Sequence, residues 1–456
     1  MEDITMRKIF QYIMLAVVTI VMASCTSDIE ETTATTGKNN IQLVVGEFPA
    51  FGDSQTRAIG TPDAGKTSWA VGDELLLEMT SKTLGTKYAA FKYNGSSWEL
   101  ASGELSYKED EVPTFPHVYY APNYKWEAGK LVLKEGKVAG TDEYIEGKAE
   151  ITGNGQSIIV KFSEATRNYS RLRIATIPNK PITVSINYFT PAGSSQAVFP
   201  NYALTSDEKG NAYLYGTFVK NSSFTVKYGG APLATHHFFE VTRNAKSYAL
   251  DATVVSANSA EEIKSAIKQE VANSKTAIRL NIASDAGDNE FKAIREAFKN
   301  VQDATIDLTL IGCKEIPADG LKELKALKSI FLPDVTKIGM NALSRCVYLE
   351  EICAPNVSTI DERAFAGFIM LEKVTLGELT DVRGEANSGS GIFDDDNWAQ
   401  YIDLYLPKNQ EVMKGEFDNN SNQYIWKPTG EKYFASPDYD NGIFLGYQFN
   451  SVKSWE

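Results

Sequence analysis

The side chains best suited to chemistry in this sequence are four thiols and three imidazoles. A thiolate can attack a carbonyl carbon, bind zinc or form a disulfide, and each use requires partners at a suitable spacing. No CxxC pair occurs, the body of the chain keeps an odd number of cysteines, and no histidine stands in a triad motif. We therefore predict no metal, cofactor or disulfide framework, and expect buried thiols in the body of the chain. The residues are Cys25, Cys313, Cys346, Cys353, His117, His236 and His237.

Cys25 is set apart from the other thiols by the segment that precedes it. Two basic residues come before a run from Ile9 to Met22 that is almost entirely apolar. A charged start and a short apolar core predict an export signal, because the run is shorter than the roughly 20 residues that span a membrane. Acidic residues beside Met1 are unusual in such a segment, so both Met1 and Met6 remain candidates for the first residue.

Small residues, Ala23 and Ser24, stand immediately before Cys25. This arrangement resembles the lipobox of bacterial lipoproteins. The resemblance implies that residues 1–24 are removed as a signal peptide and that fatty acids such as palmitate are attached to the thiol and amino groups of Cys25. Two or more chains anchor a protein durably in a membrane, whereas one chain binds marginally. A plain secretory signal with an incidental cysteine is the alternative.

Residues 25–40 are polar, rich in threonine and free of aromatic side chains. Such a segment cannot bury enough apolar surface to fold, so we predict a flexible tether. Its acidic residues also resemble the surface-export signal of lipoproteins in Gram-negative anaerobes, which implies an outer-membrane protein exposed at the cell surface. A solvated linker explains the same charges equally well.

The whole chain has an ordinary globular composition. Its 456 residues are 43% hydrophobic and 23% charged, which is typical of about three domains. The formal net charge of -14 and the lack of clustered Lys and Arg exclude nucleic acid as a partner.

Residues 41–255 consist of short alternating or apolar runs separated by turn signals, such as DELLLEMT, QSIIVKF and ITVSINYF. This alternation predicts half-buried strands, and Asn94-Gly95 between two runs predicts a hairpin turn. The pattern is typical of all-β sandwiches. We predict two of them, at residues 41–155 and 156–255, divided at the TGNGQS stretch.

The stretch TRAIGTPDAGKTSWAVGDELLLEM contains Arg57 and Ala58, then Trp69, and then Gly72 at the opening of a strand. It resembles the start of fimbrillin-family pilins, and FFEVTRNAKSYALDATV resembles the closing segment of that fold. The resemblance implies two transthyretin-like β-sandwiches. For Trp69 and Gly72 themselves, a core aromatic and a turn glycine are the simpler interpretation.

The same resemblance implies polymerisation with other pilin subunits by donor-strand exchange. A protease would cut between Arg57 and Ala58, the first strand at residues 41–48 would leave, and a neighbour's strand would fill the groove. An uncut basic residue in an exposed loop is the alternative interpretation of Arg57. A fimbrillin-like protein can also serve as an anchor or tip that is never trimmed.

Residues 256–456 have a different pattern and predict a further domain. Ser259 and Glu262 form an S-x-x-E capping box, followed by apolar residues at helical spacing, which predicts a helix. Further on, hydrophobic residues recur at intervals of 22 residues. They are Leu327, Leu349 and Leu371; Ile330, Ile352 and Val374; Val335, Val357 and Leu379; Ile338, Ile360 and Val382; and Ala342, Ala364 and Ala386.

This period with an L-x-x-I-x-[LA] pattern predicts a leucine-rich repeat, in which each repeat places a short strand on one face. Pro355, followed by Ala364 and Phe365, resembles the BspA-like class of bacterial surface repeats. The predicted fold is therefore mostly β, with two β-sandwiches followed by a short α/β leucine-rich repeat solenoid.

In each repeat, one strand residue lies between two core positions and should point away from the core. These residues are Phe331, Cys353, Thr375 and Tyr405. We expect them to line a sheet surface that contacts a host or bacterial surface protein; surface residues without a ligand are the alternative. Two acidic stretches, at 285–290 and 393–398, lack calcium-loop spacing and predict no metal site.

Together these features predict a lipid-anchored, surface-exposed protein of the outer membrane that acts in adhesion, as a pilus tip or accessory subunit with a repeat head. A non-polymerising receptor for host protein or glycan is the alternative, and cleavage after Arg57 distinguishes the two. A glycan hydrolase would need two apposed carboxylates. No such pair is indicated among the 59 acidic residues, so we predict no enzyme.

Overall fold

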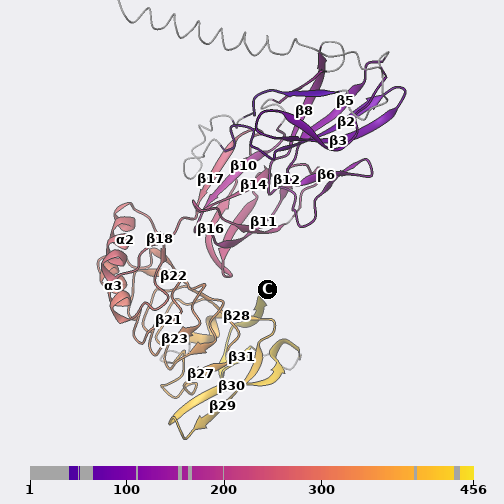
Figure 1. Ribbon diagram of the computed structural model, residues 1–456. Helices are drawn as coiled ribbons and strands as arrows, with labels where there is room; N and C mark the ends of the chain where they lie inside the picture. The colour runs from indigo at the N-terminus through magenta and orange to yellow at the C-terminus, as the bar shows by residue number, and fades with distance from the viewer. Residues whose placement is uncertain are drawn as a thin grey trace, which may run out of the picture.

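The computed structural model describes residues 41–49, 51, 65–108, 111–152, 157–162, 167–198, 200–394, 398–435 and 442–455. Within them the chain is mostly β, as the alternating pattern predicts, with two α-helices. Figure 1 shows three groups of strands that follow one another along the molecule, here called the first, second and third units. The signal peptide, Cys25, the tether, Arg57 and Ala58 lie outside the described residues. No helix in the described part is long and apolar enough to cross a membrane.

The first unit is a seven-stranded sheet in the order β1-β9-β8-β5-β2-β3-β4. β1 and β9 are parallel, and the other neighbours are antiparallel. Because side chains alternate along a strand, Leu75, Leu77 and Met79 of β2 point into one core and are fully buried. The strands are β1 (Gln42–Val45), β2 (Glu74–Ser81), β3 (Gly85–Tyr93), β4 (Trp98–Gly103), β5 (Thr114–Tyr120), β8 (Ile145–Thr152) and β9 (Ser157–Lys161), with a separate hairpin of β6 (Tyr124–Glu127) and β7 (Lys130–Leu133).

The predicted hairpin turn at Asn94-Gly95 is confirmed. It joins β3 to β4, and the Asn94 N–H donates to the Ser97 carbonyl at 3.0 Å. Gly95 has a φ of 107°, a left-handed conformation that glycine adopts without steric cost. Gly72, with a φ of 96°, likewise fits its predicted turn.

The predicted division between residues 155 and 156 is wrong. Thr152 of β8 pairs with Ser157 of β9, and both strands belong to the first sheet. The stretch between them therefore joins two antiparallel strands of one sheet. It resembles a linker between domains because glycine and asparagine are as common in hairpin connections as in linkers. The first sheet ends at Lys161, and the next unit's first strand begins at Ser170.

The second unit holds two four-stranded sheets, in the orders β12-β14-β10-β17 and β13-β11-β15-β16. Apolar residues of both sheets form one core, in which Phe189, Phe218 and Phe224 are buried. The strands are β10 (Ser170–Ala175), β11 (Pro181–Ile186), β12 (Phe189–Pro191), β13 (Asn201–Thr205), β14 (Asn211–Phe218), β15 (Ser223–Tyr228), β16 (Ala231–His237) and β17 (Ser247–Asp251).

The third unit is built on an eight-stranded parallel sheet in the order β18-β19-β20-β22-β24-β26-β28-β33. A second sheet, β21-β23-β25-β27-β30-β29, shares its core. The strands of the first sheet are β18 (Val255–Ser256), β19 (Ala277–Asn281), β20 (Ile306–Ile311), β22 (Leu327–Phe331), β24 (Glu351–Ala354), β26 (Lys373–Leu376), β28 (Asp403–Pro407) and β33 (Ser451–Trp455). Those of the second are β21 (Glu315–Ile316), β23 (Lys337–Ile338), β25 (Thr359–Ile360), β27 (Asp381–Arg383), β29 (Glu411–Asp418) and β30 (Gln423–Lys432), and β31 (Ile443–Phe444) pairs with β32 (Tyr447–Gln448).

The predicted 22-residue register is confirmed. Ile330 of β22 pairs with Ile352 of β24, Ile352 pairs with Val374 of β26, and Val374 pairs with Leu404 of β28. All four side chains are buried in one core, because each repeat sets an equivalent side chain against that of its neighbour.

Two helices, α2 (Ala260–Ala272) and α3 (Asp288–Phe298), lie side by side at the amino-terminal end of the third unit (Figure 1). The Ser259 hydroxyl accepts a hydrogen bond from the Glu262 N–H at 3.3 Å, which confirms the predicted cap. The apolar side of each helix packs on the core that the repeats continue.

Candidate functional site: a cleft between the second and third units

One wall of the cleft is the outer face of the second unit's sheet β13-β11-β15-β16. On β11, Ile182 and Val184 are buried in the core, so the alternating Thr183 and Ser185 point outward. Strand β15 repeats this pattern, with Phe224 and Val226 buried and Thr225 and Lys227 facing outward. Strand alternation thus produces a polar face rich in hydroxyl groups.

The opposite wall belongs to the parallel sheet of the third unit. Cys353 of β24 pairs with Thr375 of β26, which pairs with Tyr405 of β28, so these three side chains form a row across the sheet. Glu351 and Lys373 form a second pair two residues earlier on β24 and β26. The row consists of three of the four outward positions that the repeat pattern predicts.

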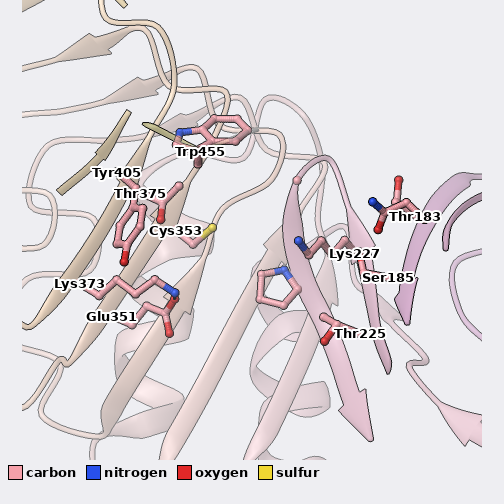
Figure 2. Close-up of a pocket in the computed structure, with 13 residues that line it drawn as sticks. Thr183, Ser185, Thr225, Lys227, Glu351, Cys353, Lys373, Thr375, Tyr405 and Trp455 are labelled. Atoms are coloured by element: carbon pink, nitrogen blue, oxygen red, sulfur yellow. The ribbon is translucent and has the colours of Figure 1, made fainter. Parts of the chain in front are cut away.

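The two walls enclose a cleft of about 580 Å³, and Figure 2 shows their side chains facing each other across it. This volume lies within the range of about 300–1,000 Å³ that is common for small-ligand sites. The lining residues are Thr183, Ser185, Asn201, Thr225, Lys227, Gly230, Pro232, Glu351, Cys353, Lys373, Thr375, Tyr405 and Trp455.

The turn between β15 and β16 contacts the repeats beside the cleft. Gly229 and Gly230 have φ values of 54° and 88°, and a Cβ on them would lie 3.0 Å and 3.2 Å from Pro333 and Pro355 respectively. The Asn356 amide donates to the carbonyls of Gly229 at 3.3 Å and Pro333 at 2.6 Å. The turn therefore rests directly on two successive repeats.

Further contacts join the two units beside that turn. The Arg279 guanidinium of β19 donates to the Leu233 carbonyl of β16, and Ile311 of β20 belongs to the apolar core of the second unit. Burial and the nearby Asp334 carboxylate raise the pKa of Tyr228. Apolar and polar contacts therefore both cross the junction beside the cleft.

Charge in the cleft is distributed unevenly. Lys373 pairs with Glu351 at 2.7 Å, and although partial burial opposes it, this pairing raises the pKa of Lys373. Lys453, beside the cleft, pairs with Asp403 at 3.1 Å. Lys227 has no ion-pair partner among the described residues. One lysine therefore brings an uncompensated positive charge to the second-unit wall.

Three of the four predicted contact residues, Cys353, Thr375 and Tyr405, meet in this cleft, whereas Phe331 is not among the residues that line it. Cys353 is only 5% exposed, and residues of the second unit stand opposite it across the cleft. The second-unit wall could not be predicted from the sequence. Alternation along a strand indicates which residues point outward, but it does not indicate what those residues face.

The cysteines of the described part are free and buried, as predicted. Burial raises the pKa of each thiol to about 12, so none is poised to act as a nucleophile at neutral pH. They are Cys313, Cys346 and Cys353.

The described part of the acidic stretch at 393–398 serves a structural role. The Asp394 carboxylate accepts hydrogen bonds from the N–H groups of Asn387, Gly389 and Gly391 at 2.7–2.9 Å and from the Tyr447 hydroxyl at 2.7 Å. Burial opposes ionisation, but these bonds lower the pKa of Asp394. Among the described residues, no group of three or more His, Cys, Asp and Glu is arranged to hold a metal ion.

The amino-terminal segment is a second feature with functional interest. Among the described residues, β1 is an edge strand that pairs with β9 alone, and its Leu43 and the preceding Ile41 are buried in the first core. The Trp69 indole donates to the Gly46 carbonyl at 2.8 Å. Phe48 packs against the rings of Trp69 and Tyr120 at centroid distances of 4.9 Å and 5.5 Å.

A buried ion pair holds the end of this segment. The Arg167 guanidinium donates to the Pro49 carbonyl and lies 4.2 Å from the ring centroid of Phe51. It also pairs with Glu143 at 3.3 Å, and the two side chains are 0% and 4% exposed. Glu143 accepts a further hydrogen bond from Tyr169. Sequence analysis missed this clamp because its members are separated by long stretches of chain.

Comparison with known proteins identifies no relative. No protein-family model, no curated protein and no solved structure matches the chain.

Proposed function

We propose that this chain is a cell-surface lipoprotein that acts in adhesion, as a fimbrillin-like pilus tip or accessory subunit. In this proposal the first and second units are transthyretin-like β-sandwiches, and the third is a BspA-like leucine-rich repeat solenoid. Lipid on Cys25 holds the protein in the outer membrane, and the repeat head recognises the partner. The protein binds its partner and does not transform it.

The observation that carries this proposal is the cleft built on the outward row of the repeats. Its walls come from two units, and side chains suited to recognition line both of them. A glycosidase places two carboxylates on either side of the bond that it cleaves. In the described part of the chain, Glu351 is the only carboxylate that lines the cleft, and Lys373 neutralises it. This supports binding as the task of the site.

Support for a pilus role comes from the amino-terminal segment. β1 lies at a sheet edge, and loss of residues 41–51 would uncover apolar surface now covered by Ile41, Leu43 and Phe48. A strand from another subunit can fill such a slot with main-chain hydrogen bonds. The cleft lies between the second and third units, so it is formed without residues of the first unit, which holds β1.

A non-polymerising receptor is the second candidate, and one observation favours it. The cleft is complete within a single chain, because both of its walls come from the second and third units. Binding therefore requires no neighbouring subunit.

Antibody labelling of intact cells with serum against the third unit tests both candidates. We expect label on the cell surface and at filament ends, because the lipid anchor and the tip position would expose the head. Cys25→Ser should remove the label from intact cells. Arg57→Ala should remove it from filament ends only, whereas a receptor would label identically with and without this substitution. Absence of label from intact wild-type cells would contradict both candidates.

A further inference from the structure

The central strands of the cleft walls offer side chains, and not backbone, to a ligand. β11 lies between β13 and β15, and β24 and β26 lie between other strands of the parallel sheet, so their N–H and C=O groups are paired within the sheets. The edge strands β13, β16 and β33 also contribute lining residues, which are Asn201, Pro232 and Trp455. On the central strands, recognition therefore comes from side chains.

Those side chains offer many hydroxyl groups at close spacing. Thr183 and Ser185 stand on one wall and Thr375 on the other, and none of these side chains makes a hydrogen bond within the described residues. Each hydroxyl can donate one hydrogen bond and accept two, so a ligand rich in hydroxyl groups would satisfy them in either direction. Oligosaccharides have this chemistry.

An aromatic ring, that of Trp455, adds an apolar surface to the cleft. The Trp455 indole N–H is already used, because it donates to the Leu376 carbonyl at 2.9 Å. Its ring is only partly buried and lines the cleft, so the remaining surface is apolar and rigid. Such a ring suits the C–H face of a sugar.

The positive charge of Lys227 favours a sugar that bears a carboxylate. Lys227 reaches toward the row of Cys353 and Thr375 from the opposite wall, as Figure 2 shows, and it has no ion-pair partner among the described residues. Its charge is close enough to Cys353 to oppose the rise in the pKa of that thiol. In a protein with a net charge of -14, this local positive site would attract a carboxylate.

From these observations we propose that the cleft binds an acidic oligosaccharide, with the ligand carboxylate on Lys227, its hydroxyl groups on the threonine and serine side chains, and a ring face on Trp455. The proposal names the ligand of the adhesin described above, and its biological role rests on that function. Sialic acid and uronic acids supply the same carboxylate, so the experiment must separate these two sources.

The test is calorimetric titration of the purified full-length protein with sialyllactose and with trigalacturonic acid. We expect one of them to bind, and lactose or maltotriose to bind about tenfold more weakly, because the neutral sugars lack the charged hydrogen bond. Lys227→Gln should weaken acidic-sugar binding about tenfold, and added salt should weaken it further. The control Lys220→Gln, an exposed lysine of the same unit that does not line the cleft, should leave binding unchanged.

Thr375→Val provides a second variant that keeps size and shape, and it should weaken binding of either sugar class. The proposal would be overturned by equal affinity for acidic and neutral sugars, by no effect of Lys227→Gln, or by failure of both acidic sugars to bind at about 10 mM. Binding of a poly-glutamate peptide in place of the sugars would overturn it in favour of an acidic protein segment. Sugar binding in vitro by a protein that never labels intact cells would sink the adhesin proposal alone.

Discussion

Replacing Arg167 by methionine is expected to lower the free energy of unfolding by about 3–5 kcal/mol. The substitution leaves the Glu143 carboxylate buried without its cation, and it removes the hydrogen bond to the Pro49 carbonyl and the contact with the Phe51 ring. A buried charge without a partner costs more than a typical hydrogen bond contributes. Denaturant titration, with hydrogen exchange of the β8 and β10 amides, measures the effect.

Two comparisons make this test specific. The double variant Arg167→Met with Glu143→Gln should cost less than the sum of the single variants, because neither charge remains buried alone. Lys161→Met removes an ion pair with Glu150 whose side chains are 60% and 59% exposed, and should cost only about 0–1 kcal/mol. A cost for Arg167→Met as small as that of Lys161→Met would show that the clamp does not hold the segment.

Phe48→Ala is expected to cost about 3–5 kcal/mol, the usual result of removing a buried aromatic ring. The ring is 5% exposed and packs edge-on against Trp69 and Tyr120, so its loss leaves a cavity beside the Arg167 guanidinium. Because Phe48 follows an edge strand, we expect the β1 amides to exchange faster than those of the central β2 and β5. Native-state hydrogen exchange resolves this difference.

Phe417→Ala is the matched control for the loss of Phe48. Phe417 is 55% exposed on β29, and its removal should change the free energy of unfolding by less than about 0.5 kcal/mol. Uniformly faster exchange across the whole first sheet in Phe48→Ala would contradict the idea that the amino-terminal segment opens as a separate element.

Both variants concern how the amino-terminal segment is retained. β1 contributes only four residues to its ladder with β9, whereas residues 46–51 contribute the Trp69 hydrogen bond, the Phe48 packing and the Arg167 clamp. The residues after the strand therefore add side-chain contacts to those of the strand in holding the segment. In the proposed pilus role, cleavage at Arg57 would leave the strand in place until a neighbour's strand displaced it.

The elements that sequence analysis predicted best are those with local or periodic signals. The series Ile330, Ile352 and Val374 repeats the same core contact in each neighbour, so its spacing of 22 residues alone predicts the strand register. The Asn94-Gly95 turn and the Ser259 cap depend on conformations and hydrogen bonds within a few residues, and both could be recognised from residue type.

Features that depend on contacts between distant segments could not be predicted in the same way. The alternating pattern of Ser157–Lys161 predicts a strand. Only the pairing of this strand with β8 and β1 assigns it to the first sheet. The alternation on β11 and β24 indicates outward positions, yet it does not show that the two faces meet across a cleft. Arg167 and Glu143 likewise show no pattern that would connect them before folding.

The mature amino terminus tests the central claim most directly. Intact-mass and amino-terminal mass spectrometry should be applied to protein from outer-membrane and sheared-pilus fractions of cells that naturally make it. The account predicts lipid-modified Cys25 in the membrane fraction, with a chain beginning at Ala58 in the pilus fraction if the protein serves as a tip. Detection of only an unacylated, uncut chain beginning at Met1 or Met6 would contradict both the adhesin and the receptor.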